Sequence, residues 1–160
     1  MQKIQIKNKN MKTLPYSAQQ IWDIIIDFKA YSEWWPSKVK TKALKISNEV
    51  IGSQIEVRPY GGMGFICEVV KVKPNTELVM EYSGLYKGLG VWTISENNGQ
   101  CNVAYEINLD VNHPLIRISS HLLPVDKIHY NLMEKVFLGL EQKLVTKFGN
   151  ANHNELKRDT

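Results

Sequence analysis

Histidine is the side chain best suited to acid–base or metal chemistry near neutral pH, and this chain has four. They are His113, His121, His129 and His153. The first three are eight residues apart, but Pro114 and Pro124 break any continuous helix through them. No cysteine or carboxylate completes a compact ligand set around them. We therefore predict no metal site and no metal cofactor.

His129 is retained as a candidate catalytic residue. It lies one turn before Met133, along the edge of the apolar face of a long predicted helix. At this edge it is either a boundary residue of the core or an acid–base group in a cavity, and both interpretations stay open. We include His129 and Met133 among the candidate ligand-binding residues.

Glu68, in a predicted strand, is the second candidate. If Gly61 and Gly62 form the loop of its hairpin, Glu68 falls on the apolar face, where an ionised carboxylate is costly. A raised pKa would then make it a general acid or base as well as a ligand contact. A slip of one residue would turn Glu68 outward and bring inward Arg58, which is the remaining catalytic candidate. The register is left open, and either way one polar group is expected in the interior.

Aromatic side chains form a third group that could contact a ligand. Four of them fall on inward-facing strand positions near Gly90, whose missing side chain leaves space for a ligand or for a bend of the sheet. Buried tyrosine hydroxyls need hydrogen-bond partners, so this group suits either core packing or an oxygenated hydrophobic ligand. The candidate ligand-binding residues are Tyr82, Tyr86, Gly90, Trp92 and Tyr105.

The chain contains no nucleophile elbow, phosphate-binding loop or dinucleotide fingerprint. The glycine-rich segment YGGMG at residues 60–64 joins two predicted strands, whereas a phosphate-binding loop would join a strand to a helix. It is therefore interpreted as a hairpin turn, and no cofactor is predicted.

The elements that must position these residues begin with a strand over residues 2–14. A helix follows, with Ser17 as its N-cap and an apolar face that includes Ile21 and Ile25. A short second helical turn leads to the corner YSEWWPSKV, which Pro36 ends. We expect Trp35 to pack in the core at this corner and Trp34 to be partly exposed near the mouth of a cavity.

Residues 39–111 carry strand and hairpin signals. The clearest is Asn98-Gly99, the favoured pair for a two-residue type I′ turn. It places Trp92 opposite Tyr105 and gives the hairpin one apolar and one polar face. Residues 112–124 form a proline-bounded connection with some helical character. A long amphipathic helix is predicted over residues 125–148, with Gly149 as its stop.

The order of these elements predicts an α+β fold in which a curved antiparallel sheet of six to seven strands wraps around the long C-terminal helix. Two short helices follow the first strand. We predict a single domain over residues 1–149 and a disordered tail over residues 150–160.

In element order, in SAQQIWDIIIDFKAYSEWWP and in YKGLGVWTI, the chain resembles the SRPBCC or START-like helix-grip superfamily. Within it, the polyketide cyclase/dehydrase-like, birch-pollen-allergen-like branch is the most similar. In the first segment Trp22, Asp27-Phe28, Tyr31 and Trp35-Pro36 match the family pattern. The resemblance implies the helix-grip fold, whereas its members include carriers, cyclases and chaperone-associated domains.

The composition limits the classes of partner that this chain is expected to bind. The net charge of +4 comes from Lys3, Lys7, Lys9 and Lys12, because the other basic residues equal the 16 acidic ones in number. We interpret these lysines as the solvated face of an edge strand and expect no nucleic-acid partner. No apolar run is long enough for integral membrane association. The isolated Cys67 and Cys101 favour buried free thiols and a cytoplasmic location.

The function that fits these features is binding or carriage of a hydrophobic or amphipathic small molecule between the sheet and the C-terminal helix. A lipid, an isoprenoid or a polyketide would suit such a space. The alternatives are an enzyme that resembles the polyketide cyclases and aromatases and uses one or two acid–base residues of the cavity, and a chaperone-associated interaction domain. The sequence does not determine the ligand or the oligomeric state.

Overall fold

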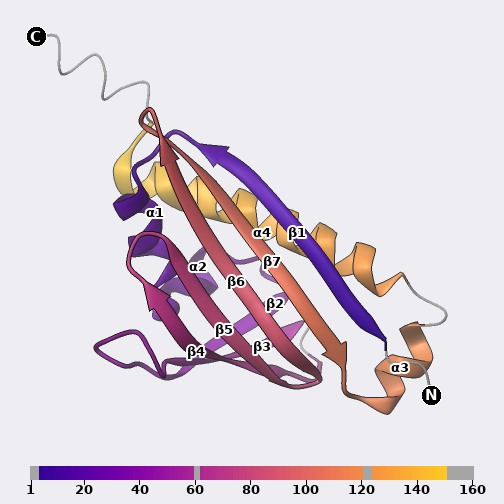
Figure 1. Cartoon of the computed structure of the whole chain (residues 1–160). Coiled ribbons are helices and arrows are strands. Elements are labelled where there is room, and N and C mark those ends of the chain that lie inside the picture. Colours follow the sequence, from indigo (N-terminus) through magenta and orange to yellow (C-terminus); the bar gives the residue numbers. More distant parts are fainter. Residues whose placement is uncertain (1–3, 60–61, 121–123, 151–160) are drawn as a thin grey trace, which may run out of the picture.

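The computed structural model describes residues 4–59, 62–120 and 124–150. A seven-stranded antiparallel sheet curves around one long helix, with short helices after the first strand (Figure 1), which confirms the predicted α+β helix-grip fold. The strands are β1 (Gln5–Leu14), β2 (Val39–Lys45), β3 (Gln54–Pro59), β4 (Phe65–Lys73), β5 (Glu77–Gly84), β6 (Tyr86–Asn97) and β7 (Gln100–Val111). The helices are α1 (Ala18–Ile25), the 3₁₀ turn η1 (Phe28–Ala30), α2 (Tyr31–Trp34), α3 (Pro114–Ser120) and α4 (Val125–Phe148). Of the predicted tail, only Asn150 lies within the described residues. None of the described helices combines the length and hydropathy needed to span a bilayer.

The sheet order is β1-β7-β6-β5-β4-β3-β2, so β1 and β2 are its edges. The β6–β7 register is the one that Asn98-Gly99 predicts, with Trp92 opposite Tyr105 and Tyr86 opposite Val111. Asn98 and Gly99 both have positive φ, as a type I′ turn requires. The central hairpin of the fold is therefore determined locally by two residues.

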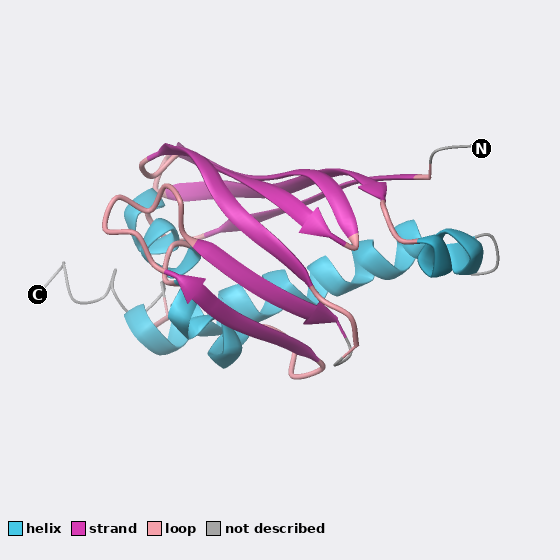
Figure 2. Ribbon diagram, turned by 90° about the horizontal axis from the view of Figure 1, so that it is seen from below, coloured by secondary structure: helices cyan, strands magenta, loops and turns pink. Residues whose placement is uncertain are grey.

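Helix α4 lies on one face of the sheet (Figure 2). It packs on the edge strand β1, whose polar side chains hold it there. Asn10 Nδ2 donates to the backbone carbonyl of Tyr130 at 3.2 Å and to Glu134 Oε1 at 2.7 Å. Further along the strand, Lys12 forms an ion pair with Glu141. Because the helix is docked over this half of the sheet, the half formed by β3 to β5 is left for other elements to cover.

Short helices cover other parts of the inner face: α1 packs on β6, and η1 and α2 pack on β2. Helix α1 begins with the predicted cap: Ser17 Oγ accepts a hydrogen bond from the Gln20 backbone N–H, and the Gln20 side chain accepts one from the Ser17 N–H. The buried face of α1 includes Ile21, Trp22 and Ile25, as expected. Helix α2 then places the double-tryptophan corner against α4.

The expected division of roles between the two tryptophans is wrong. Trp34 is 6% exposed and belongs to the core, whereas Trp35 is partly buried and lines a cavity. Gly139 on α4 explains this, because a Cβ on it would lie 1.8 Å from the Trp34 carbonyl oxygen. The glycine lets the two helices touch at Trp34. Trp35 follows with extended backbone and stacks on Tyr31, with ring centroids 5.3 Å apart.

The expectation that Glu68 or Arg58 faces the interior is also wrong. In the observed register Val57 pairs with Phe65 and Ile55 with Cys67, so the inward side chains of β4 are Phe65, Cys67 and Val69. This register differs by one residue from the one that a Gly61-Gly62 loop would give, and the slip turns β4 over while β3 keeps its face. Both polar residues therefore end on the outer face of the sheet.

The space under the C-terminal half of α4 is filled. The Trp92 ring lies 4.7 Å from that of Tyr105 and 5.4 Å from that of Phe137, measured between ring centroids. Leu140 and Leu144 are fully buried one and two turns further along α4. The space between the sheet and the C-terminal half of α4 is therefore a close-packed core, and a cavity can lie only toward the N-terminal half of the helix.

Candidate functional site

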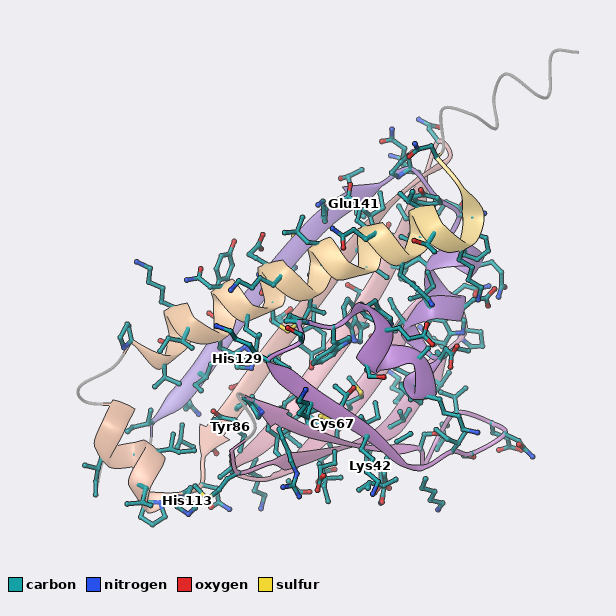
Figure 3. The ribbon with its side chains drawn as sticks, turned by 180° about the vertical axis from the view of Figure 1, so that it is seen from behind. Lys42, Cys67, Tyr86, His113, His129 and Glu141 are labelled. Carbon is teal, nitrogen blue, oxygen red and sulfur yellow. The ribbon has the colours of Figure 1, made fainter. Side chains whose placement is uncertain are left out.

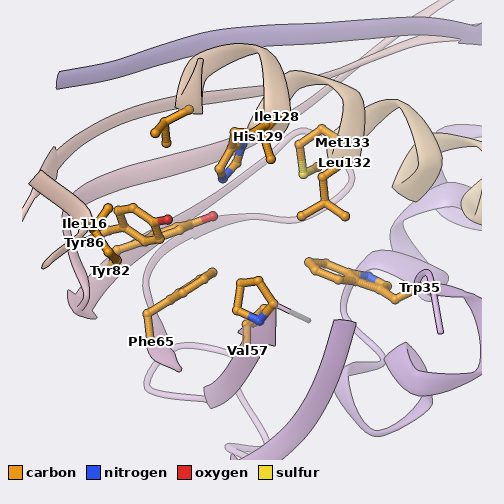
Figure 4. A pocket seen from close by; sticks show the side chains of 12 residues that line it. Trp35, Val57, Phe65, Tyr82, Tyr86, Ile116, Ile128, His129, Leu132 and Met133 are labelled. Atoms are coloured by element: carbon orange, nitrogen blue, oxygen red, sulfur yellow. The ribbon is translucent and has the colours of Figure 1, made fainter. Parts of the chain in front are cut away.

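A cavity of about 210 Å³ lies between the N-terminal half of α4 and the inner face of strands β3 to β6 (Figure 4). Helix α3 contributes one side chain to its wall, and the corner after α2 contributes another. The lining residues are Trp35, Val57, Pro59, Phe65, Tyr82, Tyr86, Ile116, Val125, Ile128, His129, Leu132 and Met133. Among the described residues, the lining is thus apolar and aromatic apart from a few nitrogen and hydroxyl groups.

Two side chains from α4 and β6 bring polar atoms to this space. His129 points from α4 into the cavity, and the Tyr86 ring lies across from it (Figure 4). Burial raises the pKa of the Tyr86 hydroxyl, so it is protonated at neutral pH. The hydroxyl can therefore donate a hydrogen bond to a ligand.

The His129 ring is neutral in this setting. Burial lowers its pKa to about 4, and no carboxylate of the described residues lines the cavity to offset the effect. Its Nδ1 is buried and has no hydrogen-bond partner among the described residues. A neutral imidazole in an apolar wall can donate or accept one hydrogen bond at each nitrogen, according to its tautomer.

Tyr82 forms the floor of the cavity, and its hydroxyl is hydrogen bonded to core residues on the side away from the cavity. It is hydrogen bonded to the Tyr105 hydroxyl and to the Cys67 thiol. Burial raises the pKa of all three groups, so they stay protonated. Gly90 lies beneath the pair: a Cβ there would be 2.3 Å from Tyr105 Oη and 2.8 Å from Tyr82 Cε1. The glycine thus makes room for two tyrosines and not for a ligand.

The nine candidate site residues, which are the eight ligand-binding candidates and Arg58, fall into three groups. Tyr82, Tyr86, His129 and Met133 all line the cavity. Gly90, Trp92 and Tyr105 lie behind its floor in the core. Glu68 and Arg58 lie outside: Gln54 Nε2 donates to Glu68 Oε2 at 2.7 Å, and Arg58 Nε donates to Glu56 Oε1 at 2.9 Å. The structure therefore brings four of the nine candidates together in one cavity.

Sequence reasoning missed most of the remaining wall. Ile128 and Leu132 are on the predicted apolar face of α4, and their spacing from His129 could have identified them. Phe65 would lie on the outer face in the register that a Gly61-Gly62 loop gives, and the observed register turns it inward. Ile116 comes from α3, where nothing in the sequence distinguishes it from Leu115 and Ile118, which are 64% and 65% exposed.

No metal-binding group was predicted, and the described residues contain no cluster of three or more histidine, cysteine or carboxylate side chains able to hold a metal ion. Cys67 and Cys101 are buried and free.

The buried imidazole predicts an acid-sensitive stability. The folded ring resists protonation down to about pH 4, whereas in the unfolded chain it protonates near its usual value of 6.5, so the unfolded state gains a proton first. The free energy of unfolding should therefore be unaffected by this group above pH 7 and fall between about pH 6.5 and 4. Replacing the ring by His129→Phe should reduce the loss between pH 7.5 and 5 by about 2 kcal/mol. Urea unfolding at both pH values measures this, and equal losses in the two chains would show that the ring is not desolvated.

A family model described as polyketide cyclase / dehydrase and lipid transport matches residues 5–128. No curated protein sequence matches the chain. Among solved structures, a START superfamily protein from Mycobacterium smegmatis has a TM-score of 0.69 at 19% identity, over 88% of this chain and 97% of that one. The Aha1 dimer from Colwellia psychrerythraea has a TM-score of 0.59 at 16% identity, over 92% and 98%. A norcoclaurine synthase point mutant from Thalictrum flavum, in complex with a transition-state analogue, has a TM-score of 0.57 at 14% identity, over 89% and 99%. At these identities the structural likenesses show the fold alone.

Proposed function

Because the chain belongs to the polyketide cyclase / dehydrase and lipid transport family, we propose that it binds or carries a hydrophobic small molecule in the cavity between α4 and strands β3 to β6. The observation that carries this proposal is the apolar lining of a space between sheet and helix. A lipid, an isoprenoid or a polyketide-like compound would place its apolar part there.

The lining can supply useful affinity without a catalytic group. Burying roughly 200 Å² of apolar ligand surface contributes about 5 kcal/mol before the cost of association. The rigid surroundings keep that cost low, because Trp35 is stacked on Tyr31 and Phe65 is stacked on Tyr82 with ring centroids 5.1 Å apart. Both aromatic walls are thus in place before a ligand arrives.

A cyclase- or aromatase-like enzyme is the second candidate, and the position of His129 is what favours it. A neutral imidazole facing Tyr86 could move a proton to or from a bound ligand. With Glu68 and Arg58 on the outer face, such chemistry would depend on His129 and Tyr86. For the third candidate, a chaperone-associated domain, the likeness to Aha1 supports the fold and nothing more.

We also propose a cytoplasmic location. Its support is the pair of free, buried cysteines, which is the state expected in a reducing compartment.

The binding proposal predicts that the protein purified without detergent carries a hydrophobic compound. Liquid chromatography and mass spectrometry of an organic extract of the pure protein should detect it in a constant molar ratio to the chain. The protein is then incubated with the extracted compound. Recovery of the compound unchanged supports binding, and its conversion to a product supports the enzyme. If no compound is extracted and no member of a library of apolar molecules binds the delipidated protein, the proposed function is wrong.

A further inference from the structure

The polar groups of the cavity wall define what the cavity can recognise. Among the described lining residues there is no aspartate, glutamate, lysine or arginine, and the one histidine is neutral at pH 7. The polar atoms are therefore limited to two tyrosine hydroxyls, the His129 imidazole and the Trp35 indole N–H.

Three of these groups have an unused hydrogen-bonding atom. The Tyr82 hydroxyl is engaged with Tyr105, but the Tyr86 hydroxyl makes no hydrogen bond to the described residues. Trp35 Nε1 and His129 Nδ1 are buried and have no partner among the described residues. Because Trp35 Nε1 and His129 Nδ1 are covered by neighbouring atoms, the polar atoms open to a ligand are the Tyr86 hydroxyl and His129 Nε2.

The size of the cavity limits the ligand. An apolar cavity of about 150 Å³ is large enough to hold a benzene molecule. At about 210 Å³ this one has room for one or two fused rings, or for a branched chain of similar bulk. It is smaller than the roughly 300–1,000 Å³ typical of sites for drug-sized ligands.

We propose that the ligand portion held in this cavity is compact and uncharged, and that it carries a hydroxyl or carbonyl oxygen bound by Tyr86 and His129. This inference rests on the proposed function and narrows its ligand class. A carboxylate or phosphate would be desolvated without a cation among the described lining residues to compensate it. An unsubstituted hydrocarbon would fill the space but leave the polar atoms unpaired.

The test uses four probes with one skeleton: naphthalene, 2-naphthol, 2-naphthoate and 2-naphthylmethylammonium. Isothermal titration calorimetry at pH 7 with the delipidated protein should show 2-naphthol binding about three- to tenfold more tightly than naphthalene, as expected for one net hydrogen bond. The naphthoate should bind at least tenfold more weakly than 2-naphthol, because its charge is buried without a partner. The ammonium probe is included because the aromatic walls could attract a cation, and tight binding of it would contradict the proposal.

Variants separate recognition of the oxygen from packing. Tyr86→Phe and His129→Phe keep the rings and remove the polar atoms, so each should weaken 2-naphthol about three- to tenfold and leave naphthalene within about twofold. Tyr130→Phe is the matched control, because Tyr130 is 41% exposed on α4 and does not line the cavity. Equal affinities for naphthalene and 2-naphthol, or a naphthoate that binds as tightly as 2-naphthol, would overturn the proposal.

The outcomes also distinguish this inference from the function on which it depends. If no probe binds but the purified protein yields a larger or charged hydrophobic compound, binding stands and the inferred ligand class is wrong. If no probe binds and no compound is found, both are wrong.

Discussion

Replacing Gly139 by alanine should destabilise the protein by about 2–3 kcal/mol, although the same change in an ordinary helix interior stabilises by about 0.5–1 kcal/mol. The added Cβ would lie 1.8 Å from the carbonyl oxygen of Trp34 and 3.0 Å from its carbonyl carbon. These are backbone atoms, which cannot move aside like a flexible side chain. Helix α2 must then shift away from α4. Urea unfolding measured by far-ultraviolet circular dichroism gives the change in free energy.

The matched control for this prediction is Gln142→Ala. Gln142 is exposed on the same helix, so its replacement should change the free energy of unfolding by less than about 0.5 kcal/mol. Unchanged or increased stability of the Gly139 variant would contradict the close contact between α2 and α4. Because the shift also displaces Trp35, the variant should lose affinity for 2-naphthol.

Filling the cavity from α4 should abolish ligand binding while leaving the fold intact. Ile128 and Leu132 are one turn apart and line the cavity, and neither is fully buried, because Ile128 is 39% exposed and Leu132 is half-buried. Ile128→Trp together with Leu132→Trp can therefore place two indole rings in the space without displacing the core. We expect at least a hundredfold loss of affinity for 2-naphthol and no co-purified compound. The free energy of unfolding should change by less than about 1.5 kcal/mol.

The control carries the same two tryptophans on the outer side of the helix, as Asn131→Trp and Lys135→Trp. Both positions are exposed and neither lines the cavity. This chain should bind 2-naphthol as the unmodified protein does. If the inner pair binds normally, or if the outer pair loses binding to the same degree, the ligand lies elsewhere.

Local signals in the sequence predicted those parts of the fold that depend on contacts between residues close in sequence. Asn98-Gly99 specified the register of β6 and β7 through the geometry of a two-residue turn. Ser17 and Gln20 specified the start of α1 through the capping box. The periodicity of residues 125–148 predicted both ends of α4, with Pro124 directly before the helix and Gly149 directly after it.

The register of β3 and β4 was not predictable in this way. Their first paired residues, Val57 and Phe65, are separated by a connection too long for one turn type to specify. Both registers bury apolar side chains, because Ile66 and Val70 would have served as well as Phe65 and Val69. The choice depends on packing of Phe65 against Tyr82 and Tyr86, which are distant in sequence.

The position of the cavity depended on contacts that the sequence does not show. The aromatic residues near Gly90 were expected to suit either core packing or a ligand. Trp92 packs on Phe137, and the Tyr105 hydroxyl is hydrogen bonded to that of Tyr82. With the Trp92–Tyr105 contact, these side chains fill the space under the C-terminal half of α4. Side chains of the edge strand β1 dock α4 on one half of the sheet and so leave the cavity at the other (Figure 3). In that view His129 and Tyr86 are found toward the N-terminal end of α4, away from Glu141.

The most direct test of ligand binding in this cavity is a methyl NMR titration of the delipidated protein with 2-naphthol. Ring-current shifts should appear at the methyl groups of Ile116 and Met133, which line the cavity, with saturation at one equivalent. The methyl groups of Leu89, exposed on the opposite face of the sheet, and of Leu144, in the solid core, should not shift. The chain with Ile128→Trp and Leu132→Trp should show none of these changes. Shifts at Leu89 with Ile116 and Met133 unmoved would contradict the central claim, which places the ligand between α4 and strands β3 to β6.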